Sequence, residues 1–185
     1  MEKVIIEQDS AWKDIFDEYL YDFMELCLPT ISKLIDWQKP IIPLDKELQR
    51  LIKPSDIGKK IVDRLFQVIL LDGNPQCILI HVEIHGKKDL NFPKSMFIYG
   101  YRIWDRYQQP LISCAILTDN NYNWRPDCYK ISFGESTLGI KFYVIKILDY
   151  ANNIEILEAS NNIFAHVILI QLYAIKAHKN AATER

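Results

Sequence analysis

The segment that most constrains the fold is Leu111–Thr118, a run without a charged residue in the middle of the chain. Such a run is typical of a strand that is buried on both faces of a sheet. Two strand-like segments precede it, Lys59–Leu71 and Gln76–His85, and Asp72-Gly73-Asn74-Pro75 between them is typical of a turn. A helical pattern from Asp89 to about Tyr107 separates this hairpin from the buried strand. We therefore expect a mixed sheet, with Leu111–Thr118 joined in parallel to Gln76–His85 by a right-handed crossover.

Helices before and after this unit are expected to cover the two faces of the sheet. The first helix starts at an N-cap, Asp9 or Ser10, and ends at Pro29. The last helix is apolar almost all round, which predicts that it is buried. The remaining expected elements are a short helix at Leu44–Leu51, strands at Tyr129–Phe133 and Leu138–Leu148, and this last helix at Asn162–His178. Because 185 residues suit one hydrophobic core, the sequence predicts a single three-layer α/β domain over residues 1–185, with a mixed sheet.

Composition restricts the function and the compartment. The net charge of −2 excludes a generally basic nucleic-acid binder, so any nucleic-acid function must depend on a local basic patch or on metal ions. The first ten residues lack a signal pattern, and the four cysteines are scattered without metal-ligand spacing. The most apolar helical stretch, Ile163–Ile175, is shorter than the ~20 residues that span a bilayer. We expect a soluble, cytoplasmic protein without a membrane partner.

The best candidate site lies on the hairpin. Alternation along a strand puts Glu83 and His85 on one face, beside His81 and Leu79. The other face is uniformly apolar and consists of Ile78, Ile80, Val82 and Ile84. If Gly73 is the apex of a three-residue loop, Asp63 lies directly opposite Glu83, with β-carbons ~5 Å apart. A slip of two residues would place Asp63 opposite His85 on the same face, and the apolar pattern excludes a slip of one.

Two carboxylates this close repel each other unless a cation or a shared proton lies between them. Oxygen ligands are those that Mg²⁺ and Mn²⁺ prefer, and such an ion could activate water for phosphoryl chemistry. Two alternatives remain open from the residues alone. Asp63 and Glu83 could be solvated residues on a half-exposed hairpin, and His85 could be a packing or surface residue.

The order of these motifs resembles the recombination-promoting nuclease and transposase-like family of the PD-(D/E)XK superfamily. The resemblance covers most of the chain from Trp12 onward. Its residues are Lys60–Leu65, Asp72-Gly73, Leu79–His85, Phe92-Pro93, Met96–Tyr99, Tyr101–Tyr107, Ala115–Asp119, Trp124–Pro126, Asn162 and Phe164-Ala165.

The resemblance implies a restriction-endonuclease-like core and a metal-dependent endonuclease acting on DNA, linked to recombination or transposition. Glu47, Asp63 and Glu83 match the family's metal ligands for Mg²⁺ or Mn²⁺. His85 stands where the family usually has glutamine or lysine, and it would orient or deprotonate the attacking water. The catalytic residues implied are therefore Asp63, Glu83 and His85. A second departure is Ser95, where an arginine is frequent.

A cluster of basic residues follows Glu83 in the sequence. Lys87, Lys88, Arg102 and Arg106 are the residues expected to contact the DNA backbone. Taken alone, a solvated helix face would explain the two arginines equally well. The rival to the enzyme is a catalytically inactive or truncated family member that binds nucleic acid or protein, and a second copy of the chain is a further partner considered.

Overall fold

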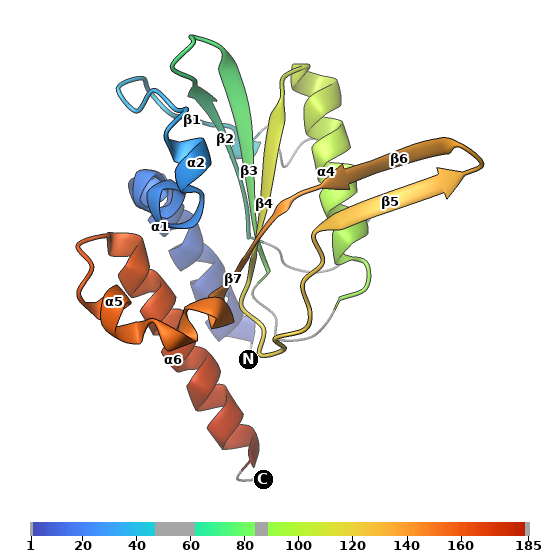
Figure 1. The fold of residues 1–185 in the computed structure, drawn as a ribbon. Helices are drawn as coiled ribbons and strands as arrows, with labels where there is room; N and C mark the ends of the chain where they lie inside the picture. Colours follow the sequence, from blue (N-terminus) through green and yellow to red (C-terminus); the bar gives the residue numbers. More distant parts are fainter. Residues whose placement is uncertain (1, 47–61, 84–88, 184–185) are drawn as a thin grey trace.

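The computed structural model describes residues 2–46, 62–83 and 89–183 (Figure 1). Within them the largest sheet has five strands in the order β1-β2-β3-β4-β7. The strands are β1 (Ile42–Pro43), β2 (Val62–Ile69), β3 (Pro75–Glu83), β4 (Leu111–Leu117) and β7 (Tyr143–Lys146). Neighbours are antiparallel from β1 to β3 and parallel from β3 to β7. The protein is therefore of the α/β class with a mixed sheet.

Helix α4 (Phe92–Tyr107) makes the expected crossover between β3 and β4. It begins three residues later than the pattern predicted, because Asp89 instead accepts a hydrogen bond from the Asn91 amide in the turn before the helix. Strand β4 is buried from Ser113 onward. The hairpin, the crossover helix and the buried parallel strand are thus confirmed.

The two longest helices pack together on one face of the sheet, not on opposite faces as expected. They are α1 (Glu2–Cys27) and α6 (Ile163–Thr183), drawn blue and red in Figure 1. Phe164 of α6 packs against Phe16 and Phe23 of α1, with ring centroids 5.6 and 4.9 Å apart. This cluster also contains the inward residues of β2, β3 and β4, and α4 covers the other face.

Both long helices also differ in detail from the prediction. Helix α1 already begins at Glu2, so neither Asp9 nor Ser10 is its N-cap, and its backbone is non-helical at Tyr19. Helix α6 is buried on one side, but Ile170 and Tyr173 are exposed, so it is not buried all round. An apolar pattern shows what a helix could bury, whereas the number of packing neighbours decides what it does bury. The shorter helices are α2 (Pro29–Ser32), η2 (Ile147–Asn152) and α5 (Ile154–Glu158).

The predicted strand Leu138–Leu148 is wrong, because the chain changes sheets within it. Residues Ser136–Lys141 form β6, which pairs with β5 (Cys128–Phe133) in a separate two-stranded sheet. Phe142 then donates its amide to Asp127 and buries its ring, after which β7 joins the main sheet. The β5–β6 hairpin extends past α4 (Figure 1).

Two expectations concern the margins of the described residues. The short helix predicted at Leu44–Leu51 is described only at residues 44–46, of which 45 and 46 are helical and Leu44 is not. Among the helices of the described ranges, none combines the length and the apolar character needed to cross a membrane.

Candidate metal centre at one edge of the sheet

The polar positions of interest gather where three parallel strands end. Glu83, Leu117 and Lys146 are the last residues of β3, β4 and β7, and they are paired in one row across the sheet. Asp63, the second residue of the antiparallel strand β2, lies at the same edge and pairs with His81. The carboxyl edge of parallel strands is where open α/β sheets commonly bind ligands.

The register of the β2–β3 hairpin differs by two residues from the one expected. Asp63 pairs with His81 and not with Glu83, so the predicted direct opposition is wrong. The loop apex is Asp72 rather than Gly73, because the Leu70 amide bonds to the carbonyl of Asn74. A slip of two preserves the alternation of faces, so Asp63 and Glu83 now occupy diagonal positions of the ladder.

The turn itself explains this register. The Asp72 carboxylate accepts hydrogen bonds from the backbone amide and the side-chain amide of Asn74, at 2.9 and 2.8 Å. These bonds lower the pKa of Asp72. Gly73 has φ of +86°, a conformation that other residues rarely adopt. Asp72 and Gly73 therefore share the turn, and the aspartate takes its apex.

The described residues bring together only part of the predicted site. The strand positions of Asp63 and Glu83 are described, and they share one edge of the sheet. The predicted metal ligand Glu47, the predicted water-orienting His85 and the predicted DNA contacts Lys87 and Lys88 lie outside the described residues. Among the described residues, no group of three or more histidine, cysteine, aspartate or glutamate side chains could hold a metal ion.

The predicted arginine pair lies along α4, away from this edge. Arg106 is in the last turn of α4, which leads into the start of β4, and Leu111 there pairs with Cys77. Glu83 is six residues further along β3, and that stretch of strand spans roughly 20 Å. Arg102 is one turn nearer. The arginines therefore do not adjoin the carboxylate edge.

A buried ion pair stands at the same edge, and sequence analysis missed it. The Lys146 ammonium contacts the Asp119 carboxylate, and the two residues are 1% and 2% exposed. Burial lowers the pKa of Lys146, while the hydrogen bond to Asp119 partly opposes this effect. Asp119 also accepts the Asn121 amide at 2.8 Å, and the ammonium lies 5.7 Å from the centre of the Trp124 ring. The pair ties the loop after β4 to the end of β7.

Two features of the sequence could have indicated this pair. Lys146 is a single charge inside an apolar stretch from Phe142 to Leu148, and Asp119 directly follows a buried strand. Charged residues are almost never fully buried unless they are paired. Nothing local, however, connects two residues that are 27 positions apart, so their pairing depends on β7 being next to β4.

A second charged network holds β2 in place on the other face of the sheet. Buried Arg64 forms ion pairs with Asp17 of α1 and with Asp45. Asp45 also accepts the Leu65 amide at 3.0 Å. Asp45 is two residues before the predicted ligand Glu47, and Leu65 is two residues after Asp63. The chain at Asp45 is therefore fixed against Arg64 and Leu65 of β2.

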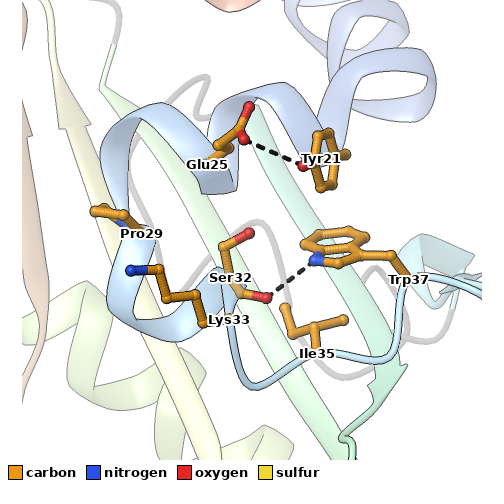
Figure 2. A pocket seen from close by; sticks show the side chains of 7 residues that line it. All are labelled: Tyr21, Glu25, Pro29, Ser32, Lys33, Ile35 and Trp37. Carbon is orange, nitrogen blue, oxygen red and sulfur yellow. Dashed lines mark hydrogen bonds between the residues drawn. The ribbon is translucent and has the colours of Figure 1, made fainter.

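A small pocket of about 220 Å³ lies elsewhere, at the end of α1 (Figure 2). Its rim includes Tyr21, whose hydroxyl donates to Glu25 at 3.1 Å, and Trp37, whose indole donates to the Ser32 carbonyl at 2.9 Å. The two rings meet edge to face, 5.0 Å apart. Both aromatic side chains are thus already engaged within the protein, and the pocket carries no residue of the predicted site.

Comparisons with known proteins give no independent guide to the site. The chain matches no protein-family model, no curated protein and no solved structure at a significant level. The edge formed by Asp63 and Glu83 therefore has to be judged on its own residues and geometry.

Proposed function

We propose that the chain is a metal-dependent nuclease of the PD-(D/E)XK type that hydrolyses DNA phosphodiester bonds. The observation that carries the proposal is that Asp63 and Glu83 occupy diagonal positions on adjacent antiparallel strands, at one edge of the sheet. The proposed architecture is a three-layer restriction-endonuclease-like core, and helices on both faces of a mixed sheet agree with it.

The diagonal positions suit a shared ion at least as well as direct opposition does. Diagonal neighbours in an antiparallel ladder have α-carbons ~7–8 Å apart, whereas directly opposed residues are closer. An oxygen-ligated cation lies 2.0–2.6 Å from each ligand atom. Carboxylates at two strand positions with this spacing are within reach of a single ion placed between them. The donor types, both carboxylates, fit Mg²⁺ or Mn²⁺.

In this proposal Asp63 and Glu83 hold the ion, with Glu47 as the third ligand. A bound Mg²⁺ or Mn²⁺ would supply a lowered pKa for its water and charge stabilisation at the phosphate. His85 follows Glu83 by two residues and would accept a proton from the attacking water with a neutral imidazole. Lys87, Lys88, Arg102 and Arg106 would bind backbone phosphates, which carry no sequence information.

The test is a nicking assay on supercoiled plasmid with Mg²⁺ or Mn²⁺. Wild type should nick the plasmid, while Asp63→Asn and Glu83→Gln should not, and both variants should lose Mg²⁺ binding in calorimetry. Glu18→Gln is the matched control, because Glu18 is exposed on α1, which packs on the face of the sheet opposite α4. Thermal unfolding of each variant checks that the fold is retained. If wild type fails to nick with either metal, the enzyme proposal is wrong and a nucleic-acid- or protein-binding module replaces it.

A further inference from the structure

The β5–β6 hairpin is an amphipathic ribbon. Its register puts Tyr129, Ile131 and Phe133 of β5 on one face, across from Ile140, Leu138 and Ser136 of β6. The opposite face carries Lys130, Ser132, Thr137 and Lys141. A two-stranded hairpin alone is marginally stable in water, so its apolar face needs a covering surface.

Helix α4 supplies that cover for the base of the ribbon. The Tyr129 ring packs against Phe97, with centroids 5.4 Å apart. The Ile140 side chain lies over Gly100, so closely that a Cβ at Gly100 would collide with it. Both contacts involve the end of the hairpin that is remote from its turn. The ribbon is therefore anchored at one end only.

The outer half of the same face is bare. Ile131 is 49% exposed, Leu138 is 59% exposed and Phe133 is 92% exposed. Helix α4 continues this surface, because Tyr101 and Trp104 follow Phe97 at helical spacing and each is about half exposed. We call the exposed apolar side chains of this ribbon face and of α4 the apolar corner, namely Ile131, Phe133, Leu138, Tyr101 and Trp104. Figure 1 shows the hairpin extending past α4.

The size of this corner matches one half of a stable dimer interface. With roughly 150–250 Å² for each whole side chain, the exposed fractions of these five residues amount to roughly 450–750 Å² of mostly apolar surface. That is at the upper limit of apolar patches on monomers, and a standard interface buries about 800 Å² per partner, more than half of it apolar.

We propose that this corner is the interface between two copies of the chain. Each copy offers both a projecting apolar ribbon and an apolar helix face, so a twofold arrangement can place the ribbon of each copy on α4 of the other. Nucleic acid fits this face less well, because Lys130 and Lys141 lie on the opposite face of the ribbon. The inference is independent of the proposed nuclease activity.

Sedimentation equilibrium of the full chain over a wide concentration range tests the proposal. Wild type should form dimers, and Phe133→Asp should weaken the dimer at least about 30-fold, as expected for a central interface residue. Phe133 is 92% exposed within one copy, so at concentrations where wild type is monomeric its replacement should leave thermal unfolding unchanged. Ile170→Asp is the matched control, an exposed apolar residue of α6 outside the corner, and it should dimerise like wild type.

Hydrogen exchange provides a second readout. Amides of β5 and β6 should become more protected as wild type is concentrated, and those of Phe133→Asp should not. Wild type that remains monomeric at about 100 μM would overturn the proposal. A dimer that is disrupted by Ile170→Asp but not by Phe133→Asp would overturn it as well. Protection of the hairpin that appears only on addition of DNA would assign the surface to nucleic acid instead.

Discussion

Removing either partner of the buried pair of Lys146 and Asp119 should lower the free energy of unfolding substantially. We consider Lys146→Met, which keeps most of the side-chain volume but removes the ammonium. The Asp119 carboxylate is only 2% exposed, and without the ammonium it retains the hydrogen bond from the Asn121 amide. An ionised carboxylate left buried without its counter-ion typically costs 3–5 kcal/mol. Because one hydrogen bond remains, we expect about 3 kcal/mol.

Urea unfolding followed by tryptophan fluorescence measures this loss, and Trp124 lies beside the ammonium as a local reporter. For a chain of this length, about 3 kcal/mol corresponds to a fall in melting temperature of roughly 6–12 °C. Lys141→Met is the matched control, because Lys141 is exposed on β6, and its effect should stay within about 0.5 kcal/mol.

A double-mutant cycle separates the ion pair from general packing. Removing both charges with Lys146→Met and Asp119→Leu should recover much of the lost stability, because apolar replacements of a buried pair are often tolerated. The coupling energy between the two sites should therefore be large, in the range of 0.5–3 kcal/mol that contacting residues show. Additive effects, or a Lys146→Met variant as stable as the control, would refute the reasoning.

Three further predictions concern other parts of the chain. Gly139→Ala should destabilise the β5–β6 hairpin, because its Cβ would collide with a backbone carbonyl of β5, and hydrogen exchange of the hairpin should rise. The hydrogen bond from Arg125 lowers the pKa of Asp149, so this stability is present above the unfolded pKa of about 3.9 and is lost as pH falls through the lower folded value. Because the pair is half exposed, Arg125→Gln should reduce the acid-dependent loss by less than about 1 kcal/mol, measured by urea unfolding at pH 6 and pH 3. Exposed Cys128 should react with a thiol reagent in the native protein, whereas burial raises the pKa of Cys27 to about 12 and should delay its labelling until unfolding, as mapped by mass spectrometry.

The elements that the sequence predicted well are those that local pattern and connectivity decide together. The hairpin has a turn signal between two strand-like runs, and Leu111–Thr118 has no charge, so its burial follows from composition. A helix between two such strands leaves a parallel crossover as the usual connection. The hairpin, the buried strand and the parallel crossover are mutually consistent predictions, and the structure confirms all three.

The errors arose where pattern allows two answers. A largely apolar stretch from Leu138 to Leu148 is compatible with one strand or with two strands in different sheets, and the break at Phe142 is decided by its tertiary contacts. The hairpin register depended on which of Asp72 and Gly73 takes the apex, and two hydrogen bonds from Asn74 decide it. Neither choice changes the alternation of apolar residues, so the face of the predicted carboxylates could be inferred while their exact pairing could not.

The edge of the sheet divides into two parts with different roles. Glu83 is the nearer of the two proposed ligands, because it pairs through Leu117 with Lys146, two strand spacings or roughly 10 Å away. Asp63 pairs through His81 and Ala115 with Val144, so it lies three spacings, roughly 14 Å, from β7. Asp119 is occupied by Lys146 and cannot also serve as a ligand without exposing a buried ammonium. Sites this far apart normally act additively. Lys146→Met should therefore lower stability without changing Mg²⁺ affinity at a temperature where the variant is folded. Asp63→Asn should instead abolish Mg²⁺ binding and leave stability unchanged. Should Lys146→Met alter Mg²⁺ binding instead, Asp119 would belong to the metal centre, and the division between the two ends of this edge would be wrong.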